Sequence, residues 1–393
     1  MKTNVVTIHS LESNLKRKVR RHLRQIGFKK QNDGSLTIDG DGKDAVRALH
    51  AAQRKARLTK NREFLSDRAP NLIEHFASGK DIRPEEISPR LERIYAGTQQ
   101  SELFRLASLT WSVPVSNGFG RRLRYLVWDE SNDKLIGLIA IGDPVFNLAV
   151  RDNLIGWTAK DRSARLVNVM DAYVLGALPP YSQLLAGKMI ACLIRTREIY
   201  EDFEKQYGDT TGVISRANKQ ARLIAVTTSS SMGRSSVYNR LKLGGTRYFE
   251  SLGFTEGWGH FHIPDKLFSE LRGYLRRKEH PYADLHRFGE GPNWRLRTTR
   301  AALKELGLRD NLLRHGIRRE VFISFLASEG AKLLLTGTGK PDTSNLHNVD
   351  EVAELALERW IRPRAKRDPT YLEWTHEDLV RRVDQGETQR RSG

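Results

Sequence analysis

The sequence has little cysteine, no long apolar run and a shortage of acidic residues, and each shortage excludes a class of protein. The single cysteine, Cys192, excludes a disulfide framework and a cysteine-ligated zinc site. No segment approaches the roughly 18 consecutive apolar residues of a membrane span, and the first ten residues lack the apolar core of a signal peptide. We therefore expect a cytoplasmic protein that has no membrane partner.

Basic residues outnumber acidic ones. Of 393 residues, 66 are Lys or Arg and 47 are Asp or Glu, which gives a net charge of +19. Residues 1–70 hold 17 of the basic and 7 of the acidic residues, so over half of the excess lies in the first fifth of the chain. Such an excess favours a polyanionic partner, and we expect nucleic acid. A solvated basic face or a docking surface for an acidic protein would have the same composition.

The first 70 residues have the pattern helix, hairpin and helix. In residues 13–26 the apolar positions form one helical stripe: Leu15, Val19, Leu23 and Ile26. Basic side chains surround that stripe: Lys16, Arg17, Lys18, Arg20, Arg21 and Arg24. Residues 28–38 predict a β-hairpin, and residues 44–68 return to a basic helical pattern that includes Arg54 and Arg57. We expect these positive faces to bind the phosphates of a nucleic-acid backbone.

The middle of the chain has the spacing of an α/β fold. Strands are expected over 123–128, 135–141, 166–175, 221–228 and 258–263. Helices are expected over 181–207 and over 236–252, the second broken at Gly244-Gly245. The C-terminal third is expected to be mainly helical, including the apolar group Val321, Phe322, Phe325 and Leu326. We predict a mixed-sheet α/β core at 111–275, preceded by a basic helical region with a β-hairpin at 1–110 and followed by a helical region at 276–393.

The expected order of elements resembles the acetyltransferase fold of the GNAT class over residues 123–263. In that class a Q/R-x-x-G-x-G/A turn before the long helix holds the cofactor pyrophosphate with backbone amides. Here the turn begins at Gln183, and Ala186 and Lys188 stand at its two small positions. Phe249 stands where the class has a tyrosine that acts as general acid. The resemblance therefore implies a degenerate GNAT-like core, for which acetyl-CoA is not the expected cofactor.

A second resemblance covers residues 120–370 and has more specific motifs. The run Arg151-Asp152-Asn153-Leu154-Ile155-Gly156-Trp157, followed by Arg162 and Arg165, is similar to the RD-x-x-IGW … R-x-x-R-L pattern of the DruA family of the Druantia anti-phage systems. A later block matches that family's GT-x-Y … G-x-T-x-G-x-G element: Gly245, Thr246, Tyr248, Gly253, Thr255, Gly257 and Gly259. Phe288 and Asn293 continue the match. The resemblance implies a component of a bacterial defence system with a large helicase-like partner, and implies no reaction for this subunit.

Charged residues crowd the first of these motifs, and two interpretations stay open. Arg151, Arg162 and Arg165 could clamp a phosphate while Trp157 stacks on a base. Alternatively, Arg151 and Asp152 form a structural ion pair, and Trp157 packs in the core.

Three carboxylates are candidates for catalysis. Asp171 interrupts an apolar strand, where an unpaired carboxylate would cost several kcal/mol to bury. With Asp143 and Asp152 it could bind a divalent metal for phosphodiester cleavage. A structural salt bridge is the alternative, and it is the one that we favour.

Two smaller groups complete the candidates. Arg362 and Arg364 lie next to Trp360 in sequence, a pattern that suits a single strand or an acidic partner subunit. His260 and His262 have the spacing of metal ligands on one strand, but no third ligand has a recognisable position. We expect both to be structural histidines.

Three classes of function follow. The first is a nucleic-acid-binding subunit of an anti-phage system, which recognises invading DNA and delivers it to partner subunits. The second is an enzyme, either a metal-dependent nuclease or a transferase acting on nucleic acid. The third is a non-catalytic scaffold for partner proteins. The charge distribution favours the first class.

Overall fold

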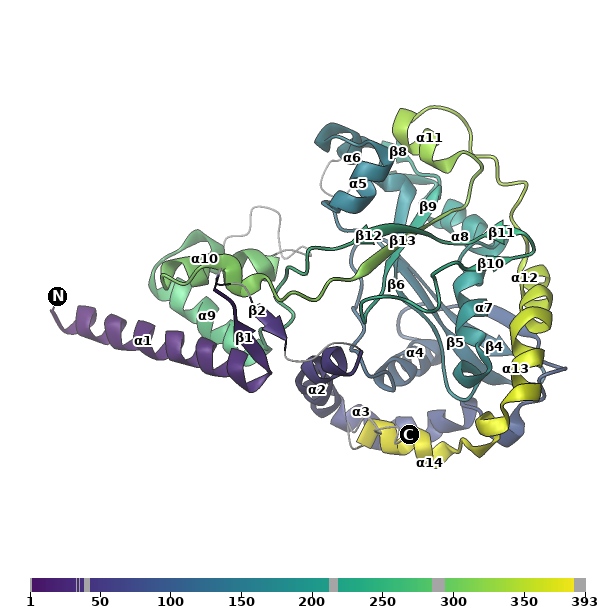
Figure 1. The fold of residues 1–393 in the computed structure, drawn as a ribbon, viewed down its shortest axis with the longest axis horizontal. Coiled ribbons are helices and arrows are strands. Elements are labelled where there is room, and N and C mark those ends of the chain that lie inside the picture. The colour runs from purple at the N-terminus through teal and green to yellow at the C-terminus, as the bar shows by residue number, and fades with distance from the viewer. Residues whose placement is uncertain are drawn as a thin grey trace. The chain divides into compact units, whose positions relative to one another are not determined.

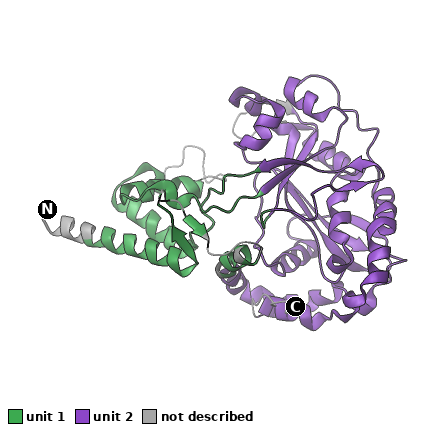
Figure 2. Ribbon diagram, in the orientation of Figure 1, with its two compact units in different colours: residues 1–53, 231–233, 254–319 green, residues 54–230, 234–253, 320–393 purple. Residues whose placement is uncertain are grey.

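The chain folds into two compact units that each draw on distant parts of the sequence. The computed structural model describes residues 2–32, 34, 36–38, 43–211, 218–284 and 294–384 (Figure 1). Unit 1 comprises residues 1–53, 231–233 and 254–319, and unit 2 comprises residues 54–230, 234–253 and 320–393 (Figure 2). The predicted boundaries at residues 110 and 275 do not coincide with this division, because the chain enters unit 2, leaves it and returns.

A mixed seven-stranded sheet lies at the centre of unit 2, as the predicted α/β fold class requires. Its strands in spatial order are β12 (Glu250–Phe254), β13 (Glu320–Phe325), β9 (Ala225–Ser229), β6 (Val169–Ala177), β5 (Lys134–Gly142), β4 (Arg122–Asp129) and β3 (Pro89–Arg93). Strands β3 to β6 pair antiparallel, β6 and β9 pair parallel, and β9 and β13 pair antiparallel.

Both faces of β4 and β5 are buried, which explains their almost unbroken apolar sequences. Successive side chains of β4, such as those of Tyr125 and Leu126, point to opposite faces of the sheet and pack in separate hydrophobic clusters. One cluster includes α7 (Ala186–Leu193), α8 (Arg197–Tyr207) and α12 (Val349–Ala356), and the other includes α3 (Arg62–Asp67), α4 (Gln99–Leu109) and α14 (His376–Asp384). The remaining elements of unit 2 are α5 (Ala149–Ile155), α6 (Ala159–Arg165), β7 (Asp209–Thr211), β8 (Asn218–Gln220), β10 (Lys242–Leu243), β11 (Thr246–Arg247), α11 (Gly330–Thr336) and α13 (Arg362–Arg367).

Unit 1 is a helical unit with a small β-hairpin. Its elements are α1 (Lys2–Gln25), β1 (Phe28–Lys30), β2 (Leu36–Ile38), residues 43–53 of α2 (Lys43–Lys60), α9 (Asp265–Arg277) and α10 (Trp294–Glu305). Leu15, Val19 and Leu23 of α1 are buried in one cluster with residues of α9 and α10. The predicted basic helix and hairpin are confirmed. Asp33 lies outside the described residues, and so do Phe288 and Asn293 of the family match. The predicted helix at 44–68 is two helices, separated at Asn61.

Two predicted elements that contain glycines are wrong. The helix expected at 236–252 is absent: the predicted break at Gly244 and Gly245, whose φ angles are 53° and 79°, is the turn of a short hairpin between β10 and β11. The strand expected at 258–263 is also absent. Trp258 makes an isolated bridge, and the chain then turns, with the Ile263 amide bonded to the His260 carbonyl.

Two further segments that were expected to be helical have a different structure. The helix expected at 181–207 is divided into a 3₁₀ turn, α7 and α8, and Leu185 at the first break has a φ of 64°. The apolar group at Val321–Leu326 belongs mainly to β13, which lies between β9 and β12 and is buried on both faces. A fully buried strand has no alternation of polar residues, so its sequence cannot be distinguished by periodicity from that of a buried helix.

Candidate nucleic-acid interface

The exposed face of α1 carries a row of arginines that we name the α1 arginine row: Arg17, Arg20, Arg21 and Arg24. These residues are spaced i, i+3, i+4 and i+7, so they share one side of the helix. The apolar stripe on the opposite side is buried, which turns the row towards solvent. Within the described part of the chain none of the four has an acidic partner. Lys18 pairs with Glu270 at 2.8 Å, and Lys16 is half-buried.

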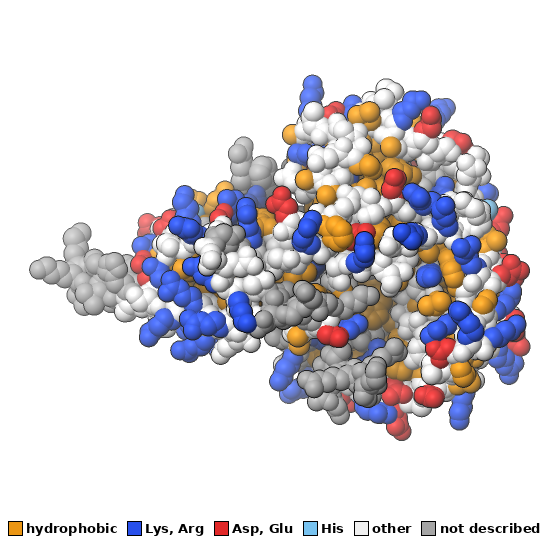
Figure 3. Space-filling view, in the orientation of Figure 1, with side chains coloured by type: hydrophobic (Ala, Val, Ile, Leu, Met, Phe, Trp, Pro, Cys, Tyr) orange, Lys and Arg blue, Asp and Glu red, His pale blue; other side chains and the backbone are white. Residues whose placement is uncertain are grey.

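The charge of unit 1 is consistent with this row. Its 122 residues carry 25 Lys and Arg against 13 Asp and Glu, so +12 of the net +19 lies in this smaller unit. Lys and Arg side chains gather over α1 and the neighbouring β1 in Figure 3. Lys29 and Lys30 of β1 are exposed. Residues 1–53 contribute +6 of this charge, and residues 254–319 contribute the other +6. The positive charge predicted for the N-terminal region therefore lies only partly in unit 1, because the basic residues from Arg54 onward belong to unit 2.

Two segments of unit 1 run antiparallel and form what we call the ribbon: residues 254–259 and residues 313–319. Thr255 donates its amide to the Arg319 carbonyl at 2.9 Å, and its hydroxyl accepts the Arg319 amide at 3.0 Å. Gly257 has a φ of 67°, and a Cβ there would lie 2.9 Å from the backbone of the opposite segment. The predicted motif residues Thr255, Gly257 and Gly259 thus form the close packing of this ribbon.

Three buried histidines and one half-buried histidine form what we call the histidine cluster: His50, His262 and His315 are buried, and His260 is half-buried. Burial lowers the pKa of His260 and of His262 to about 4 and that of His315 to about 3. His262 also contacts the Leu312 carbonyl through Nε2 at 2.9 Å. These rings are neutral at physiological pH and serve the structural role that the sequence predicts for His260 and His262.

The first family motif lies in unit 2, where its charges are paired internally. Arg151 is completely buried, and its Nη2 donates to Asp152 at 2.7 Å. Its guanidinium also donates to the carbonyls of the 145–146 loop. Arg162 donates to the same carboxylate at 2.9 Å, and Arg165 pairs with a neighbouring aspartate at 3.0 Å. Trp157 is buried, and its Nε1 donates to a backbone carbonyl at 2.7 Å. This geometry matches the structural interpretation, while Gly156 ends α5 with a φ of 81°.

Other predicted contact residues in unit 2 have internal partners as well. Arg54 and Arg57 donate to backbone carbonyls of the 111–115 segment, and Arg54 also donates to a carbonyl of α14. Arg362 pairs with two glutamates, and Arg364 pairs with an aspartate. Because these guanidinium groups are engaged, they offer less free charge to a ligand.

Each of the three candidate carboxylates has its own close partner, and the charge of Arg151 also acts on Asp171. Asp143 pairs with Arg121 at 2.7 Å, and Asp152 binds the arginines described above. Asp171 accepts a hydrogen bond from the Thr227 hydroxyl at 2.7 Å, and burial raises its pKa to about 6. Among the described residues, no group of three or more His, Cys, Asp and Glu side chains could hold a metal ion. The structure therefore does not assemble the predicted metal cluster.

The turn before α7 is covered by other residues of unit 2. The Gln183 carbonyl accepts the Nε of Arg364 at 3.2 Å, and Lys188 places its Nζ 5.5 Å from the centroid of the Trp360 ring. Phe249 and the adjacent Tyr248 are both buried. Burial raises the pKa of Tyr248 to about 12, which makes its hydroxyl a weak acid.

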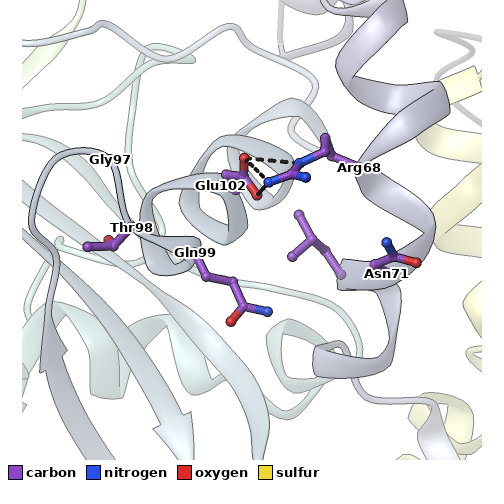
Figure 4. A pocket seen from close by; sticks show the side chains of 7 residues that line it. Arg68, Asn71, Gly97, Thr98, Gln99 and Glu102 are labelled. Atoms are coloured by element: carbon purple, nitrogen blue, oxygen red, sulfur yellow. Dashed lines mark hydrogen bonds and ion pairs between the residues drawn. The ribbon is translucent and has the colours of Figure 1, made fainter.

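Unit 2 also has a shallow polar hollow that the sequence did not indicate (Figure 4). It encloses about 280 Å³ and is lined by Arg68, Asn71, Leu72, Gly97, Thr98, Gln99 and Glu102. An ion pair between Arg68 and Glu102, at 3.1 Å, neutralises the charged groups of its wall. Residues from two separated segments form it, so no local pattern could have predicted it.

These features define a class: a strongly basic α/β protein with an exposed arginine row on one unit and an internally paired charge network in the other. A family model described as Druantia protein DruA matches residues 40–336. A Druantia protein DruA from Escherichia coli (strain UMEA 4076-1) is 63% identical over 375 residues, which cover 95% of this chain and 93% of that protein. The chain belongs to the DruA family, and this membership implies a component of a Druantia system. No solved structure matches it. Among the described residues, no helix has the length and apolar content to cross a membrane.

Proposed function

We propose that the chain is the nucleic-acid-binding subunit of an anti-phage Druantia system and that unit 1 holds the binding surface. The observation that carries this proposal is the α1 arginine row, whose four guanidinium groups have no acidic partner among the described residues. Each phosphate that such a group neutralises releases condensed counterions, which favours binding. The arginines of the family motif in unit 2 are already paired, so they offer less free charge.

The role of unit 2 in this proposal is a GNAT-like core without acetyl transfer. The antiparallel strands β3 to β6, the following α7 and the parallel step to β9 support the likeness. The covered turn at Gln183 and the buried Phe249 argue against the usual cofactor chemistry. Unit 2 would then contact partner subunits, which by the family resemblance include a large helicase-like protein, and pass on the invading DNA that unit 1 has bound.

Electrophoretic mobility of labelled duplex and single strands tests the proposal. We expect the full chain to shift both at low ionic strength and to lose much of its affinity at about 200 mM salt. Absence of any shift at low ionic strength would refute the binding function and favour a scaffold. The same strands incubated with magnesium or manganese should stay intact. Cleavage that Asp171→Ala abolishes without unfolding the chain would instead support the nuclease alternative.

A further inference from the structure

Trp258 is an exposed tryptophan on the basic unit. It retains 40% of its accessible surface, whereas Trp128, Trp157, Trp360 and Trp374 each retain at most 8%. Exposed apolar residues are common on protein surfaces, but tryptophan is the largest of them and is enriched where a protein binds a partner. The position of Trp258 in the fold indicates which kind of partner.

The ribbon holds Trp258 in a fixed position. Trp258 forms a β-bridge with Arg314 across the ribbon. The next residue, Gly259, donates its amide to the Leu313 carbonyl at 2.9 Å, and Gly257 on the other side is packed against the opposite backbone. An indole that is held on a paired backbone loses little conformational freedom when it binds a flat partner.

The charged neighbours of Trp258 are mainly arginines. Arg314 and Arg318 are exposed, and the Arg318 guanidinium lies 5.3 Å from the centroid of the Phe254 ring. Glu256 is the one acidic residue in the sequence of the ribbon. This combination of an exposed indole and exposed guanidinium groups suits a ligand that is both aromatic and anionic.

The ribbon is also connected to the α1 arginine row within unit 1. Strand β2 bonds to the ribbon, because the Leu36 amide donates to the Arg314 carbonyl at 3.0 Å. Strand β2 pairs with β1, and β1 follows α1 after a turn at Gly27. The imidazole of His22 on α1 also contacts the His262 carbonyl at 2.8 Å. Trp258 and the arginine row therefore belong to one connected part of the same unit.

We propose that Trp258 stacks on an unpaired base of a strand whose phosphates bind the surrounding arginines. This inference rests on the proposed function and deepens it, because it names a nucleic acid with unpaired bases as the preferred ligand. A paired base in a duplex has both faces covered by its neighbours and offers none to the indole. A single strand offers a face at every base.

Fluorescence anisotropy with the full chain and two labelled probes, an oligothymidine strand and a duplex of equal length, tests this inference. Stacking predicts that Trp258→Ala weakens binding of the single strand about 5- to 100-fold and changes duplex binding much less. Trp258→Phe keeps a stacking ring, so it should retain most of the affinity but lose the quenching of tryptophan emission that accompanies binding. The matched control is Tyr282→Ala, which removes another aromatic residue of unit 1 that is 42% exposed and should change neither affinity.

The outcomes separate this inference from the proposed function. If the unmodified chain binds neither probe, both fail. If it binds but Trp258→Ala binds the single strand equally well, or weakens both probes equally, only the stacking role is refuted. Loss of a copurifying partner protein, with strand binding unchanged, would assign Trp258 to a protein interface and also refute it. Thermal unfolding of Trp258→Phe, expected to match the unmodified chain, guards against misfolding as the cause.

Discussion

Replacing the α1 arginine row with glutamine should remove a defined part of the salt dependence of nucleic-acid binding. The quadruple variant R17Q/R20Q/R21Q/R24Q removes four exposed positive charges that have no acidic partner among the described residues. Glutamine has nearly the helix propensity of arginine, so α1 should remain folded. Removing the like-charge pairs at i, i+4 spacing should also stabilise the helix slightly.

The magnitude follows from counterion release. Each phosphate contact on a duplex contributes a slope of about −0.9 to log K against log salt concentration, so four contacts contribute about −3.6. Between about 50 and 200 mM salt, one contact costs about 3.5-fold in affinity, and four cost about 150-fold. We therefore expect the variant to bind more weakly at low salt and to have a slope less steep by about 3.6.

Fluorescence anisotropy of a labelled duplex over a series of salt concentrations measures both slopes. The matched control removes four exposed arginines of unit 2 that likewise have no acidic partner among the described residues: Arg62, Arg122, Arg247 and Arg359. This control changes the net charge equally but should alter the slope much less. An unchanged slope in the α1 variant, or equal slopes in the two variants, would refute the assignment of phosphate contacts to α1.

Three further predictions concern stability and titration. Arg151→Met should destabilise unit 2 by about 3 to 5 kcal/mol in denaturant unfolding, because it removes the buried partner of Asp152; an unchanged midpoint would contradict this. Three members of the histidine cluster, His260, His262 and His315, have pKa values of about 3 to 4 in the folded chain against an ordinary 6.5. Their stability contribution is therefore complete above about pH 6.5 and is lost as the pH falls towards 4, and a Tm that rises on acidification would be inconsistent with it. Thr227→Val should raise the pKa of Asp171 above about 6, because it removes a hydrogen bond to the carboxylate; carbon NMR titration measures the change.

Much of the fold could be predicted wherever one period dominates the sequence. The apolar stripe of α1 and the turn between β4 and β5 are local patterns, and both elements are present. The failures have physical causes that a local pattern does not record. Gly244 and Gly245 form a turn, and β13 has the composition of a buried helix because both of its faces are covered.

The candidate site could be predicted less well, because the availability of a charge depends on tertiary contacts. The arginines of α1 and Arg151 look alike in sequence, yet the first are exposed and the second is completely buried beside Asp152. Sequence composition groups Asp143, Asp152 and Asp171, but each of them is engaged by a side chain from another position in the sequence or structure. Exposure of Trp258 depends on the ribbon, although a tryptophan between two glycines was a signal that could have identified it.

Photocrosslinking with a bromouracil-substituted strand locates the bound nucleic acid on the full chain, so it shows whether unit 1 holds the binding surface. We expect the crosslinked peptides to map to unit 1, on α1, the β1–β2 hairpin and the ribbon. Crosslinks confined to unit 2, around the motif at Arg151 or the strands β6 and β9, would contradict it.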